Sequence, residues 1–220
     1  MKITIKTNTS NKIKDLSAIT QKNQQIYAER NGYKWVCDYF EYDTPEFNEN
    51  ALAELRQIRD YIQSTDVLMV VGADVMFMNQ WVTVEDILQP NDNVVVAKER
   101  LKWWPINNDV MIYVNTPDTL KLVDRFIDDF PIWQQYQWRQ QQHLWNMIQI
   151  DPWVRSTVRI VEAEVMNQHP NHWQLGDFIL HMYSLSIPEK IAIAEKMTVL
   201  FPDYLPVYGG INDNHMPDVL

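Results

Sequence analysis

The sequence predicts a mixed α/β fold in which a mainly parallel central sheet is flanked by helices. Three observations favour this class. Strand-like and helix-like segments alternate from the start of the chain. Residues 67–79 form an almost continuous apolar run, typical of a strand that is buried on both faces inside a parallel sheet. Finally, 46% of the 220 residues are hydrophobic, which is enough to build the core of one domain.

The first five elements follow the order strand, helix, strand, helix, strand. They are expected at residues 2–7, 14–32, 33–40, 50–63 and 66–72. Leu16, Ile19 and Ile26 give the first helix an apolar face, and Gly32 is a suitable stop. This order predicts right-handed crossovers and a doubly wound sheet.

The remaining elements are less regular. They are expected as a short helix at 84–88, strands at 93–97 and 109–114, helices at 116–130 and 137–150, a strand at 158–161, an apolar segment at 178–181 and a helix at 188–197. The tail from Phe201 carries prolines and two adjacent glycines, which disfavour regular structure. We therefore expect one domain over residues 1–200 and a C-terminal extension over residues 201–220.

Charge and cysteine usage narrow the class of protein. A formal net charge of −10 repels polyanions, so a nucleic-acid partner is disfavoured. The best basic patch is Lys98, Arg100 and Lys102, which fits either a solvated face or contacts to a small anionic ligand. Cys37 is the single cysteine, which excludes an internal disulfide and fits a reducing compartment.

The chain also lacks the signals of export and membrane insertion. Its first residues alternate like a strand and contain no apolar run of signal-peptide length. The run at 67–78 is shorter than the ~20 residues needed to cross a bilayer. We expect a cytoplasmic protein with no membrane partner.

Several common active-site motifs are missing. With 5 glycines the chain has no phosphate-cradling loop, and it has neither a cysteine cluster nor a nucleophile elbow. Polar residues at predicted strand ends remain: Asp74, the group Asn107 to Asp109, and the pair Asp177 and His181. A carboxylate and an imidazole suit Mn²⁺ or a similar cation, whereas His181 taken alone fits a core histidine at least as well.

Charged and aromatic side chains nearby extend this candidate site. Lys98 and Arg100 follow the strand at 93–97, where they would stabilise an anionic leaving group or form surface ion pairs. Trp103 and Trp104 precede Asn107, and flat aromatic faces suit sugar rings. We expect these two tryptophans, together with Asn107 and Asn108, to contact an acceptor.

The order of several motifs resembles a family of glycosyltransferases. A helix reads Asn-Gln-Gln-Ile-Tyr-Ala-Glu-Arg-Asn-Gly-Tyr at 23–33, and another carries Leu-Arg-x-Ile-Arg at 55–59. An apolar strand then ends in Gly-Ala-Asp at 72–74, and the chain closes with Gly-Asp-Phe-Ile-Leu-His-Met at 176–182. Over roughly residues 20–185 this arrangement is similar to the galactosyl- and mannosyltransferase family of the yeast Golgi type, which includes the plant xyloglucan xylosyltransferases.

The resemblance implies a GT-A fold and transfer of a sugar from a nucleotide-diphosphate donor to an acceptor hydroxyl, with retention of configuration and Mn²⁺ or Mg²⁺ as cofactor. Carried over, Asp74 and His181 hold the metal. Catalytic roles fall to Asp74, Asp109 and Gln141. Donor contacts fall to the end of the first strand and the first helix, at Lys6, Thr7, Asn8 and Tyr27, together with Lys98 and Arg100.

Two departures from the family pattern keep other functions open. Gly72 replaces the first Asp of the family's Asp-x-Asp motif, and Gln140 stands where an Asp is usual. One alternative is therefore a catalytically degenerate module that binds a nucleotide-sugar. Another is a bacterial or viral enzyme that glycosylates a hydroxylated DNA base.

Overall fold

The computed structural model describes residues 1–40, 47–100 and 105–201. Its centre is a six-stranded sheet in the order β2-β1-β3-β6-β5-β7. The strands span β1 Ile3–Ser10, β2 Lys34–Phe40, β3 Val67–Val71, β5 Val94–Lys98, β6 Ile106–Val114 and β7 Val158–Val161. All neighbours pair in parallel except β6, which is antiparallel to both β3 and β5. The prediction of a mainly parallel sheet is confirmed.

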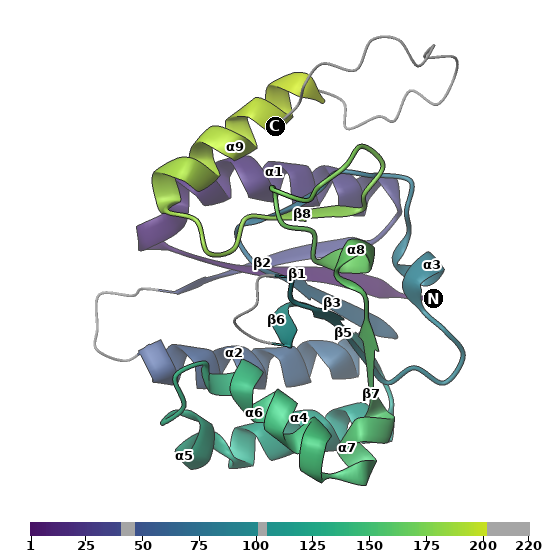
Figure 1. The fold of residues 1–220 in the computed structure, drawn as a ribbon. Helices are drawn as coiled ribbons and strands as arrows, with labels where there is room; N and C mark the ends of the chain where they lie inside the picture. Colours follow the sequence, from purple (N-terminus) through teal and green to yellow (C-terminus); the bar gives the residue numbers. More distant parts are fainter. Residues whose placement is uncertain (41–46, 101–104, 202–220) are drawn as a thin grey trace.

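Helices cover both faces of this sheet (Figure 1). One layer contains α1 Lys14–Arg30 and α9 Ile187–Leu200, which pack against each other. The opposite layer contains α2 Phe47–Ser64, α4 Pro117–Asp128, α5 Phe130–Trp133, α6 Arg139–Ile150 and α7 Pro152–Thr157. The remaining short helices are η1 Asn11–Ile13, α3 Val84–Ile87 and α8 Ala163–Met166.

The apolar run at 67–79 forms two strands instead of one. It breaks at the Gly72–Asp74 turn, and its second half becomes β4 Val75–Phe77, which pairs antiparallel with β8 Ile179–His181 in a separate small sheet. Asn23 of α1 fixes β4, because its amide donates to Phe77 O at 2.9 Å and accepts from Phe77 N at 2.7 Å. The strand expected at 66–72 is therefore confirmed as β3, whereas β4, in the second half of the apolar run, was not predicted as a separate strand.

The buried side chains form a separate cluster on each side of the sheet. Leu68 and Val70 of β3 face α2, α4 and α6, whereas Val67, Met69 and Val71 face α1. This alternation explains the continuous apolar run, because both faces of β3 are covered. A third cluster joins α9 to β4, β8 and α1.

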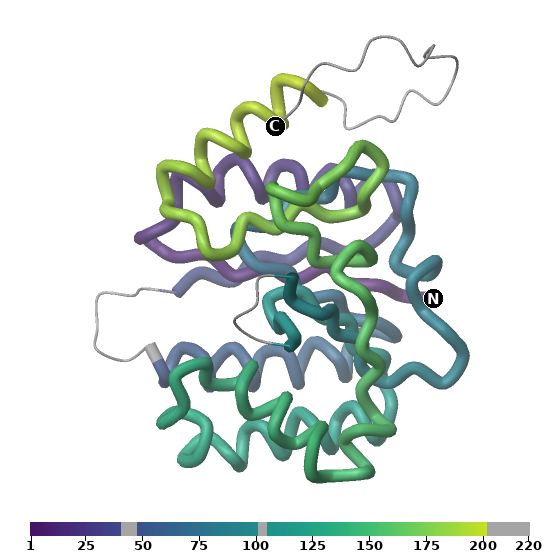
Figure 2. The backbone as a smooth tube through the Cα atoms, viewed as in Figure 1, coloured from purple at the N-terminus to yellow at the C-terminus, as the bar shows by residue number. Residues whose placement is uncertain are grey.

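The last third of the chain connects the two helical layers (Figure 2). After α7 it passes through β7 to α8, β8 and α9 on the other side of the sheet. The helical bounds agree with the sequence to within a few residues for most elements, although the predicted helix at 116–130 is divided between α4 and α5. The predicted extension at 201–220 falls almost wholly outside the described residues and stays a prediction.

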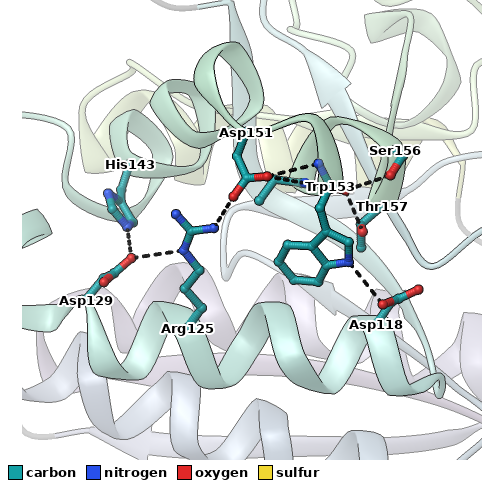
Figure 3. Close-up of polar contacts among 9 residues, drawn as sticks. Asp118, Arg125, Asp129, His143, Asp151, Trp153, Ser156 and Thr157 are labelled. Carbon is teal, nitrogen blue, oxygen red and sulfur yellow. Dashed lines mark hydrogen bonds and ion pairs between the residues drawn. The ribbon is translucent and has the colours of Figure 1, made fainter.

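A polar network ties α4 to α6 and α7 (Figure 3). Arg125 of α4 lies between two carboxylates, 2.5 Å from Asp151 Oδ2 and 3.5 Å from Asp129 Oδ2. His143 Nε2 lies 2.9 Å from Asp129 Oδ2. Asp151 also caps α7, because its Oδ1 accepts from Trp153 N at 2.9 Å. The network positions the helices that close one side of the site described below.

No helix within the described part of the chain has the length and apolar character that crossing a membrane requires.

Candidate active site

The site begins at the turn between β3 and β4, which carries Asp74. Side chains of α1 hold the backbone of this turn. Thr20 Oγ1 donates to Ala73 O at 2.6 Å, and Gln24 Nε2 donates to Gly72 O at 3.2 Å. Both side chains are fully buried. The turn is therefore fixed by buried hydrogen bonds, and the direction of Asp74 is set by the helix beneath it.

The small sheet brings His181 next to Asp74. In the β4–β8 ladder Val75 is opposite His181, and Met182 N donates to Asp74 O at 3.1 Å. His181 Nε2 consequently lies 3.3 Å from Asp74 Oδ1, and the imidazole is completely buried. The predicted pair of Asp74 and His181 is thus brought together, on opposite strands of one ladder.

Asn167 determines which nitrogen of His181 faces the carboxylates. His181 Nδ1 lies 2.7 Å from Asn167 Oδ1, and an amide oxygen can only accept, so Nδ1 carries the proton. Nε2 then points toward Asp74 and, at 3.6 Å, toward Oδ2 of Asp109. It is buried, and apart from these charged contacts it has no hydrogen-bond partner of good geometry among the described residues. Such an orphaned nitrogen next to carboxylates is suited to a cation.

The reversed direction of β6 supplies Asp109. Because β6 is antiparallel to β3, its N-terminal half lies at the edge of the sheet where β3 ends. Val110 is opposite Val71, so Asp109 reaches the Gly72–Asp74 turn. The side chain of Asp109 is 55% exposed, whereas that of Asp74 is largely buried and that of His181 completely so. Asp109 is therefore the more accessible of the two acids.

Lys190, in the first turn of α9, completes the charged centre. Its Nζ lies 2.6 Å from Asp74 Oδ2, and the two side chains are 14% and 15% exposed. Burial by itself would raise the pKa of Asp74, but His181 and Lys190 outweigh it and hold that pKa well below its ordinary value. Burial opposes the charged form of His181, yet Asp74 and Asp109 raise the net pKa of the imidazole.

A cavity of about 460 Å³ opens onto these residues. Its polar end is lined by Asp74, Asp109, Asn108 and Lys190, and its apolar side by residues of α2, α4 and α6 such as Phe126. Glu99, after β5, has its pKa raised to about 7, chiefly by burial and against the influence of nearby His181 and Asn107. The arrangement is an acidic centre at the mouth of a partly apolar cavity.

Three of the predicted donor contacts are corrected by the structure. Tyr27 is fully buried, stacks on Phe77 with ring centroids 3.9 Å apart, and donates to Val82 O at 3.0 Å. Lys6 and Thr7 are also fully buried, and Lys6 Nζ lies 3.1 Å from Asp38 Oδ2. Direct contact with a donor is therefore wrong for these three side chains, because the sheet encloses them together with α1 or, for Lys6, with α2.

Asn8 lies at the cavity, where its amide donates to Glu54. Lys98 and Arg100 form ion pairs with Glu162 and Glu164 near the surface. Contact of Asn8, Lys98 and Arg100 with a donor stays a prediction.

The predicted acceptor residues are only partly described. Trp103 and Trp104 lie outside the described residues. Asn107 is buried and accepts from Asp109 N at 2.9 Å, so it braces the catalytic candidate. Gln141 Oε1 accepts from Asn108 N at 3.2 Å, while its neighbour Gln140 lines the cavity. The acceptor roles of Asn107 and Asn108 and the catalytic role of Gln141 stay predictions.

The donor types at the centre fit a divalent cation of the Mn²⁺ kind. An orphaned imidazole nitrogen faces two carboxylates, and Asn167 orients the imidazole from behind. Among the described residues, however, no group of three His, Cys, Asp or Glu side chains has the spacing of a metal cluster. The fit is therefore that of two protein ligands, Asp74 and His181, with the other positions left to substrate oxygens and water.

Four residues of this region have no signature in the sequence. Lys190, Asn167, Glu99 and Glu54 reach the site from α9, the segment after α8, the loop after β5, and α2. Their side chains are common types on ordinary elements, so only the three-dimensional arrangement selects them.

The fold is shared with solved glycosyltransferases. One that is involved in glycosylation of the major capsid of PBCV-1 matches with a TM-score of 0.73 and 16% identity, over 89% of this chain and 99% of that one. GlyE of Streptococcus pneumoniae matches with a TM-score of 0.56 and 12% identity, over 92% of this chain and 64% of that one. The galactosyltransferase LgtC, solved in complex with donor and acceptor sugar analogs, matches with a TM-score of 0.54 and 8% identity, over 92% and 100%.

Comparison of the sequence with protein families and curated proteins does not identify a family for this chain. No family model matches the chain, and no curated protein matches it either. At such low identities the matches establish a common fold, and function has to be argued from the site.

Proposed function

We propose that this protein is a glycosyltransferase that moves a sugar from a nucleotide-diphosphate donor to an acceptor hydroxyl. The observation that carries the proposal is the contact of Asp74 with the orphaned Nε2 of His181 at the mouth of the cavity. The fold shared with three glycosyltransferases supports it. A buried imidazole that faces carboxylates suits a site that neutralises a diphosphate.

Asp74 and His181 would hold the cation, Mn²⁺ or Mg²⁺. When bound, it would supply positive charge to the departing nucleotide diphosphate. Asn167 keeps the proton on Nδ1 of His181 and so leaves Nε2 free. Thr20 and Gln24 fix the turn that aims Asp74, which provides the preorganisation that such a site needs.

Asp109 has a separate role in this proposal. It is the more exposed acid, and it lies on the cavity side of the centre. Glycosyl transfer passes through a transition state with positive charge on the sugar ring, which a nearby carboxylate stabilises. The apolar side of the cavity limits the access of water and so favours transfer over hydrolysis. Retention of configuration is part of the proposal.

The test is a screen of nucleotide-sugars with purified protein and Mn²⁺. A donor that binds only the folded state raises the melting temperature, and its turnover releases nucleoside diphosphate. We expect Asp74→Asn to lower turnover at least about 100-fold. Asp128→Asn, at an exposed position of α4, is the matched control and should retain wild-type turnover. Equal turnover by Asp74→Asn and wild type would remove Asp74 from the mechanism.

A second function, donor binding without transfer, is favoured by two observations. Gly72 leaves the centre without the first acid of the expected motif, and Lys190 already neutralises Asp74. A binding module would take up a nucleotide-sugar tightly and leave it intact in the presence of a broad acceptor panel. Release of nucleoside diphosphate under those conditions would show that the protein is an enzyme and not only a binding module.

A further inference from the structure

The strongest unexplained feature of the site is the lysine bound to its central acid. Lys190 Nζ lies 2.6 Å from Asp74 Oδ2, although the two residues are 116 positions apart in the chain. Both side chains are largely buried. Asp74 therefore divides its two oxygens between the ammonium of Lys190 and the imidazole of His181. A divalent cation at Asp74 and His181 would need this same carboxylate.

Besides the imidazole of His181, the part of the chain that the structure describes brings no other basic side chain to Asp74. Among the described residues that line the cavity, Lys190 is the only lysine or arginine. Lys6 is committed to Asp38, and Lys98 to Glu162. Among the described residues, the one ammonium or guanidinium at the polar end of the cavity is therefore that of Lys190, held on the first turn of α9.

Gly72 stands at the position where the family motif has a second acid. A Cβ built on Gly72 would lie 2.9 Å from Asp74 Oδ1 and 3.6 Å from Asp109 Cβ, so a side chain here would enter the acidic centre. The short approach involves the end of the flexible Asp74 side chain, which can move aside. The absence of a carboxylate at position 72 and the presence of an ammonium at Asp74 both reduce the negative charge available to a divalent cation.

We propose that Lys190 is a tethered competitor of the divalent cation. Its ammonium neutralises Asp74 in the free protein, and the cation must displace it to bind. The proposal rests on the metal site of the proposed function. It implies that the free protein binds Mn²⁺ weakly. It also implies that a bound cation releases the ammonium of Lys190 at the polar end of the cavity, where the ammonium would meet an anionic diphosphate.

The experiment measures Mn²⁺ alone, without nucleotide, by electron paramagnetic resonance of the free ion and by titration calorimetry. Lys190→Met should bind Mn²⁺ about tenfold more tightly than wild type, because the cation then meets an unpaired carboxylate. Lys190→Arg keeps the charge and should bind like wild type. Lys196→Met removes a lysine from an exposed position of the same helix and is the control for net charge.

A second variant makes the same test in the opposite direction. Gly72→Asp returns a carboxylate to the centre and should tighten Mn²⁺ binding in the wild-type background, and further when combined with Lys190→Met. If Lys190→Met melts at a much lower temperature than wild type, the Mn²⁺ affinity of Gly72→Asp provides the test instead. Circular dichroism and melting curves identify variants that remain folded.

The outcomes separate this proposal from the proposed function. Unchanged or weaker Mn²⁺ binding by folded Lys190→Met would overturn the competition, whatever the protein does with nucleotide-sugars. An equal gain in Lys196→Met would overturn it as well, because general charge would then explain the effect. Tighter Mn²⁺ binding without any donor turnover supports the competition and contradicts only the transferase.

Discussion

His181 Nδ1 and Asn167 Oδ1 lie 2.7 Å apart in the interior of the protein. This contact leaves Nε2, the other nitrogen, as the one that faces Asp74 and Asp109. Asn167 is itself fixed, because its Nδ2 donates to Lys98 O at 2.9 Å at the end of β5. One buried amide therefore links the central sheet to the orientation of the imidazole.

The first prediction concerns this amide. Asn167→Leu removes the acceptor of Nδ1–H and should weaken Mn²⁺ binding by about 10- to 100-fold, because the imidazole loses its fixed tautomer. Asn167→Asp retains an acceptor oxygen and should bind Mn²⁺ more tightly than Asn167→Leu. Calorimetric titration of both variants is the measurement. Equal affinities in the two would show that orientation by residue 167 is unimportant.

Tyr27 allows a test of burial against donor contact. Tyr27→Phe keeps the stack on Phe77 and loses only the hydrogen bond to Val82 O. We expect a loss of about 0.5–1.5 kcal/mol in the free energy of unfolding, measured in urea, because Val82 O loses its donor. Donor affinity should not change. A weakened donor affinity in a fully folded Tyr27→Phe protein would restore the original assignment.

Glu99 predicts a defined pH dependence of stability. Burial raises its pKa from 4.5 to about 7, so between these values the folded protein binds more protons than the unfolded chain. The contribution of this group to stability is complete below pH 4.5 and is lost as the pH rises through about 7. Relative to Glu99→Gln, the wild-type protein should therefore lose stability between about pH 5 and about pH 8, because this interval contains the pKa of the folded state. Urea unfolding at several pH values measures the difference, and a difference independent of pH would contradict the assignment.

The network of Figure 3 predicts unequal costs for its members. Asp151→Ala removes both the cap of α7 and the partner of Arg125, whereas Asp129→Ala removes no cap. We expect Asp151→Ala to lower the free energy of unfolding by about 1–3 kcal/mol, from one cap and one partly exposed ion pair. Asp129→Ala should cost less, because it removes no cap. Denaturant titration of both variants decides the order.

The sequence was sufficient for elements whose pattern is local. The alternation at β1 and the apolar faces of α1 and α4 are properties of a few consecutive residues, and these elements form where they were expected. The direction of β6 is different, because an antiparallel strand has the same apolar pattern as a parallel one. The division of residues 67–79 into β3 and β4 also escapes local patterns, since β4 forms by pairing with β8, far along the chain.

The site divides in the same way. Asp74 could be predicted because an apolar run ends there, and His181 because its surrounding motif resembles a known one. Lys6 was assigned to the donor because the first strand was expected to end near it, whereas β1 continues to Ser10, and Asp38 and α2 enclose the lysine. Lys190 could not be found, since a lysine in the first turn of a helix is usually solvated. Only the packing of α9 on α1 brings it to Asp74.

The β4–β8 ladder also has a consequence for biosynthesis. Asp74 and Asp109 emerge from the ribosome long before His181 and Lys190, so the nascent chain carries two acids at this edge without their counter-charges. The ladder cannot close until β8 has been made. A chain that ends before β8 would therefore lack both His181 and Lys190, and with them the imidazole and the ammonium that face Asp74.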